Sequence, residues 1–116
     1  MKLKSISGVA YQVQDLSRTA AFYESLGFRT GKQEADTLTV YVNWFWVEFR
    51  TQDGAGATGQ DAGSSLYLAV DDVDESYQEL LGKGIAPAGE PATVNGRREF
   101  TITDPDGYQL VLFKKK

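Results

Sequence analysis

The chain has 116 residues, a net charge of −4, and neither histidine nor cysteine. This length predicts one domain that is large enough to bury a core. Without histidine and cysteine, Ser-His-Asp and Cys-His nucleophiles and zinc sites built on His and Cys are excluded. The negative charge argues against nucleic acid as a partner, because phosphates require a basic face.

The beginning of the sequence, MKLKSISGVAYQV, lacks the apolar stretch and cleavage site of a signal peptide. No apolar run approaches the roughly 20 residues needed to span a bilayer. We therefore expect a cytoplasmic protein without membrane contact. The absence of cysteine suits that compartment.

The first half of the chain predicts a β-α-β-β-β module over about residues 4–51. A short amphipathic helix is expected to begin after an N-cap at Asp15 and to stop at Gly27. Strands are expected at 6–13, 28–34, 37–42 and 44–51.

The second half repeats this plan at an offset of 57 residues, over about residues 64–114. The matching pairs are Val13 and Val70, Asp15 and Asp72, Leu16 and Val73, Gly27 and Gly84, and Phe28 and Ile85. Strands are expected at 64–70, 85–89, 97–103 and 108–114, with a DPDG turn between the last two. The glycine-rich residues 52–63 are expected to link the modules flexibly.

The segment NWFWVEFR at residues 43–50 poses the main question about function. Side chains of a strand alternate between its two faces. One set, expected to face the core, is Phe45, Val47 and Phe49. The other set is Trp44, Trp46, Glu48 and Arg50. This second face could bind a ligand, hold a catalytic acid, or be a sheet face covered by aromatic side chains.

Two βαβββ modules, an xVxDL strand-to-helix junction and a DPDGxxxxxF ending make the chain resemble the vicinal oxygen chelate superfamily. That group includes glyoxalases, extradiol dioxygenases, fosfomycin resistance enzymes and bleomycin resistance proteins. The segment RREFTITDPDGYQLVLF at 97–113 carries the most specific part of the resemblance. It implies an α+β fold in which the two modules form a curved mixed sheet, with helices on its outer face and a ligand cup on its concave face.

The enzymes of this superfamily resemble one another at a divalent metal site with up to four ligands. The resemblance places these ligands at Gly8, Glu48, Ser65 and Val111. Glycine and valine offer no donor atom, and a neutral serine hydroxyl is a poor ligand for a transition metal. By strand parity the carboxylates in the cup would be Glu48 and Glu99, too few oxygens for magnesium or calcium. We therefore expect no metal and no cofactor, and no metal-dependent lyase or dioxygenase activity.

Positions with the same parity as the lost ligands are expected to line the cup. The candidate ligand-binding residues are Trp44, Trp46, Glu48, Arg50, Tyr67, Gln12, Gln109 and Phe113. Indole and phenol rings could stack on a planar ligand, while a few polar groups fix its orientation. The preferred hypothesis is a metal-free protein that sequesters a hydrophobic or aromatic small molecule, with an antibiotic as one candidate. The resemblance also implies a homodimer.

Several alternatives stay open from the sequence. Glu48 could act as the general base of a metal-independent isomerase or lyase, or simply pair with Arg50 on the same strand face. Trp44 and Trp46 could bury area at a dimer interface, since aromatic residues are enriched there. Tyr67 could be a packed sheet residue. The chain could also be a glyoxalase-like protein without a ligand, with a structural or regulatory role.

Overall fold

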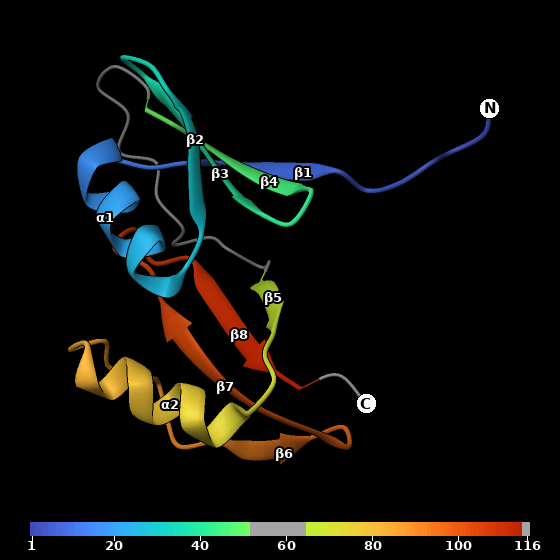
Figure 1. The fold of residues 1–116 in the computed structure, drawn as a ribbon, viewed down its shortest axis with the longest axis vertical. Coiled ribbons are helices and arrows are strands. Elements are labelled where there is room, and N and C mark those ends of the chain that lie inside the picture. The colour runs from blue at the N-terminus through green and yellow to red at the C-terminus, as the bar shows by residue number, and fades with distance from the viewer. Residues whose placement is uncertain (52–64, 115–116) are drawn as a thin grey trace. The chain divides into compact units, whose positions relative to one another are not determined.

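The computed structural model of the chain describes residues 1–51 and 65–114. Two helices and eight strands make up its regular structure (Figure 1). In chain order they are β1 (Gly8–Gln12), α1 (Leu16–Leu26), β2 (Arg29–Gln33), β3 (Thr37–Val42), β4 (Phe45–Arg50), β5 (Ser65–Ala69), α2 (Val73–Gly82), β6 (Ala92–Val94), β7 (Arg97–Thr103) and β8 (Gln109–Phe113). Neither described helix is long and apolar enough to cross a membrane.

The chain divides into two compact units, Met1–Gly59 and Gln60–Lys116. Each unit carries one helix and one four-stranded mixed sheet. Sheet one has the order β1-β4-β3-β2, and sheet two has the order β5-β8-β7-β6. In each sheet one pair of strands is parallel, β1 with β4 and β5 with β8, and the other pairs are antiparallel. The predicted α+β fold with two βαβββ modules is confirmed.

Helix α1 covers one face of sheet one. The ring of Tyr23 on α1 is fully buried and lies 4.7 Å from the ring of Phe49 on β4 and 5.1 Å from that of Phe28. Val47 is also buried, so β4 turns its apolar side toward the helix, as the alternation predicted. Phe45 is only half-buried because it begins the strand, next to a turn.

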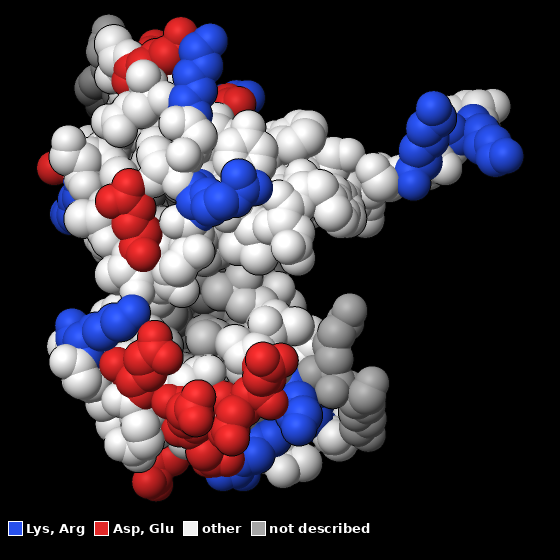
Figure 2. All heavy atoms as spheres, in the orientation of Figure 1, with Lys and Arg blue, Asp and Glu red and all other residues white. Residues whose placement is uncertain are grey.

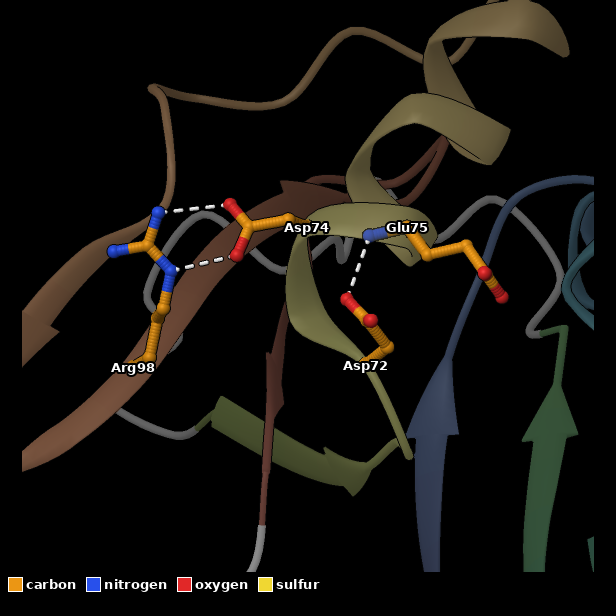
Figure 3. Close-up of polar contacts among 4 residues, drawn as sticks. All are labelled: Asp72, Asp74, Glu75 and Arg98. Atoms are coloured by element: carbon orange, nitrogen blue, oxygen red, sulfur yellow. Dashed lines mark hydrogen bonds and ion pairs between the residues drawn. The ribbon is translucent and has the colours of Figure 1, made fainter.

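Helix α2 covers one face of sheet two, where the rings of Tyr77 and Phe100 meet edge to face at 5.4 Å. At the start of α2, Arg98 on β7 donates from Nε and Nη2 to the two carboxylate oxygens of Asp74, at 2.9 and 2.8 Å (Figure 3). These hydrogen bonds hold the pKa of Asp74 below its ordinary value and raise the pKa of Arg98. The exposed side of α2 is acidic (Figure 2), with Asp74 and Glu75 in its first turn.

The internal repeat is visible at both ends of each helix. Asp15 accepts from the backbone N–H of Arg18 at 3.1 Å, and Asp72 accepts from that of Glu75 at 2.9 Å (Figure 3). After α1, Gly27 adopts a left-handed φ of 106°. After α2, the helix ends at Gly82, and the left-handed glycine, Gly84, follows one residue beyond the C-cap.

The prediction of a strand at 85–89 is wrong, because these residues form no strand. Pro87 has no N–H to donate to a ladder, and Ala88 makes a single backbone bond to the carbonyl of Thr101 at 2.9 Å. The edge strand is β6 instead. It pairs with β7 through a turn in which Asn95 and Gly96 both have positive φ, the signature of a two-residue type I′ hairpin.

The expected linker at 52–63 lies outside the described residues. One domain over residues 1–116, with module boundaries near 51 and 64, stays a prediction.

Candidate ligand-binding faces

Each sheet has a face opposite its helix, which we call the distal face. On sheet one, paired residues of β1, β4 and β3 form three rows across this face. The rows are Gly8–Trp46–Tyr41, Ala10–Glu48–Thr39 and Gln12–Arg50–Thr37. The predicted residues Gln12, Trp46, Glu48 and Arg50 are therefore neighbours on one surface, as strand parity indicated.

Trp44 does not belong to this strand face. It lies in the two-residue turn before β4, beside Asn43, which has a left-handed φ of 56°. The expectation that Trp44 shares the strand face of Trp46 is therefore wrong, because β4 begins one residue later, at Phe45. At this position the Trp44 side chain is 64% exposed.

The indole of Trp46 lies over Gly8 on the neighbouring strand. A Cβ atom added at Gly8 would fall 2.3 Å from Nε1 of the indole and 2.5 Å from Cδ1 and Cε2. The ring thus occupies the space into which any side chain at residue 8 would project. Trp46 is nevertheless 41% exposed, so part of its ring remains open to a ligand.

Tyr41, paired with Trp46 across β3 and β4, covers a second glycine. A Cβ added at Gly31 would fall 2.3 Å from Cε1 of Tyr41. The guanidinium of Arg29 lies 5.4 Å from the centre of the Tyr41 ring and donates to the carbonyl of Asn43 at 2.9 Å. Sequence reasoning did not select Tyr41, although strand alternation in β3 places it on this face.

Glu48 sits in the middle of the distal face and is ion-paired with Arg50, whose Nε donates to its carboxylate. Both side chains are partly exposed. The geometry therefore contains the same-strand pair that the sequence left open as a structural alternative. As a general base, Glu48 would have to accept a proton from a substrate while its carboxylate is ion-paired with Arg50.

The distal face of sheet two carries a different cluster. Tyr67 on β5 and Phe113 on β8 meet edge to face at 5.8 Å. The guanidinium of Arg97 on β7 lies 5.1 Å from the Tyr67 ring centre and 5.4 Å from that of Phe113. Arg97 also pairs with Glu99, with Nε and Nη2 each 3.2 Å from the same oxygen.

Sequence reasoning did not select Arg97 as a site residue. The alternation of β7 could have indicated it, because Phe100 and Ile102 are buried while Arg97, Glu99 and Thr101 lie on the opposite face. The remaining predicted residue on this face, Gln109, accepts from the hydroxyl of Ser65 at 3.3 Å.

The residues at the four implied metal-ligand positions do not fit a metal. In the first unit, Gly8 has no donor and its side-chain space holds an indole, while Glu48 is paired with Arg50. In the second unit, Val111 is buried and has no donor, and Ser65 is hydrogen-bonded to an amide. Within residues 1–51 and 65–114, no group of three or more His, Cys, Asp or Glu side chains could hold a metal ion.

This architecture, a pair of βαβββ units with helix-covered sheets, defines a class of proteins built from tandem modules. A family model of the Glyoxalase/Bleomycin resistance protein/Dioxygenase superfamily matches residues 5–112. The chain belongs to this superfamily. A search of curated proteins found no match to the sequence.

Solved structures share the fold over nearly the full chain. A bleomycin-binding protein complexed with bleomycin is 26% identical, with a TM-score of 0.76 over 97% of this chain and 100% of that one. A bleomycin resistance determinant encoded on the transposon Tn5 is 25% identical, with a TM-score of 0.78 over 97% and 99%. A superfamily member from Sphaerobacter thermophilus DSM 20745 is 22% identical, with a TM-score of 0.78 over 97% and 98%, and shows the fold alone.

Proposed function

We propose that this protein binds and sequesters a hydrophobic or aromatic small molecule without a metal. The observation that carries the proposal is the partly exposed indole of Trp46, which is seated over Gly8. Such a seat holds an aromatic surface in place before a ligand arrives. Preorganised flat surfaces suit planar ligands, because little side-chain freedom is lost on binding.

Two similar proteins support an antibiotic as the ligand. One is described as a bleomycin-binding protein in complex with bleomycin, and the other as a bleomycin resistance determinant. Both proteins are only 25–26% identical to this chain. We therefore propose a ligand of the same type, and not bleomycin itself. Drug resistance by sequestration is the corresponding biological role.

We propose contacts to such ligands on both distal faces and at the turn of Trp44 beside sheet one. The proposed residues are Gln12, Trp44, Trp46, Glu48 and Arg50 of the first unit, and Tyr67, Gln109 and Phe113 of the second. Aromatic members would supply stacking area. Polar members would select among ligands by their hydrogen-bonding groups. The pairing of Glu48 with Arg50 favours this role over that of a general base.

A panel of flat aromatic antibiotics, with bleomycin included, tests the proposal by isothermal titration calorimetry. At least one compound should bind, and Trp46→Ala should weaken it by roughly 1–3 kcal/mol, the scale of stacking on aromatic side chains. Leu81→Ala is the matched control, since Leu81 is an exposed apolar residue on α2 and lies outside both distal faces. Binding that ignores Trp46, or no binding across the panel, would contradict the proposal.

We also propose that the chain forms a homodimer, in which the exposed Trp44 contributes to the interface. Its side chain is a large apolar surface in a turn, a residue type enriched in interfaces. Light scattering at micromolar concentration should give the mass of two chains, and Trp44→Ser should shift it toward one. A mass of one chain for the native protein would rule the dimer out.

A further inference from the structure

Arg97 is held in place on the distal face of sheet two by three neighbours. Its guanidinium lies 5.1 Å from the ring centre of Tyr67 and 5.4 Å from that of Phe113. Nε and Nη2 both lie 3.2 Å from one oxygen of Glu99. Because β8 separates β5 from β7, only the folded sheet brings these residues together.

The contact with Glu99 leaves part of the guanidinium available. A guanidinium has five N–H donors in a fixed plane. Among the described residues, the hydrogen bonds and ion pairs of the Arg97 side chain go to Glu99, along its Nε–Nη2 edge. The Nη1 group is therefore a donor of fixed direction beside two aromatic rings. Tyr67 is 49% exposed, so its ring remains accessible next to that donor.

The charge of this cluster selects the kind of acceptor. The Glu99 side chain is only 13% exposed and already neutralises Arg97. The Glu99 carboxylate repels an anionic ligand group at Nη1 and so offsets part of the attraction of the guanidinium, while an anion also loses more hydration than a neutral acceptor. A neutral acceptor gains the hydrogen bond without that repulsion.

We propose that Arg97 is a ligand-recognition residue, which donates from Nη1 to a neutral carbonyl oxygen or ring nitrogen of a planar aromatic molecule resting against Tyr67. This inference rests on the proposed function and deepens it by naming the ligand class. Aromatic amides, ketones and nitrogen heterocycles are favoured, and aromatic carboxylates are disfavoured.

Two probes that share one ring system test the selectivity, namely 2-naphthamide and 2-naphthoate. Their dissociation constants are measured by NMR titration of the protein's backbone N–H signals. The same titration shows whether the probe binds at β5, β7 and β8. The native protein should bind 2-naphthamide at least about fivefold more tightly than 2-naphthoate, a difference of about 1 kcal/mol. Arg97→Gln should weaken 2-naphthamide by about fivefold, the effect of losing a hydrogen bond worth about 1 kcal/mol, and should weaken 2-naphthoate more, because Glu99 is then uncompensated.

Glu99→Gln supplies the sharper test. It keeps the shape of the side chain and leaves the Arg97 charge uncompensated, so the preference should reverse toward 2-naphthoate. Arg98→Gln is the matched control, because the adjacent arginine points to α2 on the opposite face and pairs with Asp74. It should leave both affinities unchanged. If Arg97→Gln fails to fold, Arg97→Lys takes its place, since it keeps the charge but loses the planar donor.

The outcomes separate this inference from the proposed function. A native preference for 2-naphthoate, or amide binding that Arg97 variants do not alter, would overturn the role of Arg97. If a panel antibiotic still binds in a Trp46-dependent manner, the proposed function survives that result. Failure of the naphthyl probes and of every antibiotic would overturn both.

Discussion

The indole of Trp46 rests on Gly8, its partner across β1 and β4. Residue 8 is the position at which the resemblance to metal-dependent relatives implies a ligand, and its side-chain space is filled by the indole. The indole therefore occupies the space into which a side chain at residue 8 would project, and part of its ring is exposed on the distal face.

Gly8→Ala should disturb Trp46 without removing it. The new methyl group would overlap the indole, and overpacking of this kind costs roughly 1–3 kcal/mol where neighbours cannot move. Because Trp46 is partly exposed, we expect its ring to turn outward. In a Trp44→Phe background, the fluorescence of Trp46 should shift to longer wavelength, and the affinity for any ligand found should fall.

Gly89→Ala is the control for that experiment, since a Cβ at Gly89 would meet nothing within 4 Å. It should leave the emission and the affinity unchanged. Native-like fluorescence in the Gly8→Ala protein would show that the indole does not sit on Gly8.

The two faces of β4 should respond differently to truncation. Phe49 is fully buried against Tyr11 and Tyr23, so Phe49→Ala should lower the free energy of unfolding by about 3–5 kcal/mol. Trp46→Ala should cost much less, because its ring is partly in water. Urea denaturation of both variants measures the difference. A Trp46→Ala protein less stable than Phe49→Ala would mean that the faces are assigned wrongly.

Divalent metals should change the melting temperature very little. A metal bound to the native state at 100 times its dissociation constant would add roughly 2.7 kcal/mol. Zinc, nickel, cobalt, manganese and magnesium can each be tested by thermal denaturation at micromolar concentration. A rise of several degrees that disappears in Glu48→Ala would contradict the metal-free proposal.

The ion pair between Asp74 and Arg98 should make a pH-dependent contribution to stability. The folded-state pKa of Asp74 is lowered, so the stabilisation is present above the unfolded pKa of about 3.9 and is lost as the pH falls through the lowered folded value. At pH 7 the native protein should therefore melt at a higher temperature than Arg98→Gln. The gap should close in strong acid, once Asp74 is protonated.

Arg98→Lys separates charge from geometry in that experiment, because lysine cannot donate to both carboxylate oxygens in one plane. It should lie between the native protein and Arg98→Gln at pH 7. The pair is exposed, so the effect should be small. A gap that widens in acid would show that the protonation linkage has been assigned with the wrong sign.

Features that depend on near neighbours in the chain could be read from the sequence. Asp15 and Asp72 accept from N–H groups three residues ahead, and the buried set in β4 follows strict alternation. The dipeptide Asn95-Gly96 is also a local signal, typical of a type I′ turn. It was not used when the strand was predicted at 85–89 instead of next to this turn. Trp44 was assigned to a strand because alternation cannot show at which residue a turn ends.

The sequence by itself determined the two βαβββ modules, the N-caps of their helices and the two faces of β4, because these follow from capping and alternation over a few residues. Only the tertiary structure decided which side chains touch. Gly8 meets Trp46 across the paired strands β1 and β4, and Arg97 meets Tyr67 from strands β7 and β5, which both pair with β8. Such contacts depend on register and on the direction in which each ring turns, and packing against neighbouring strands sets both.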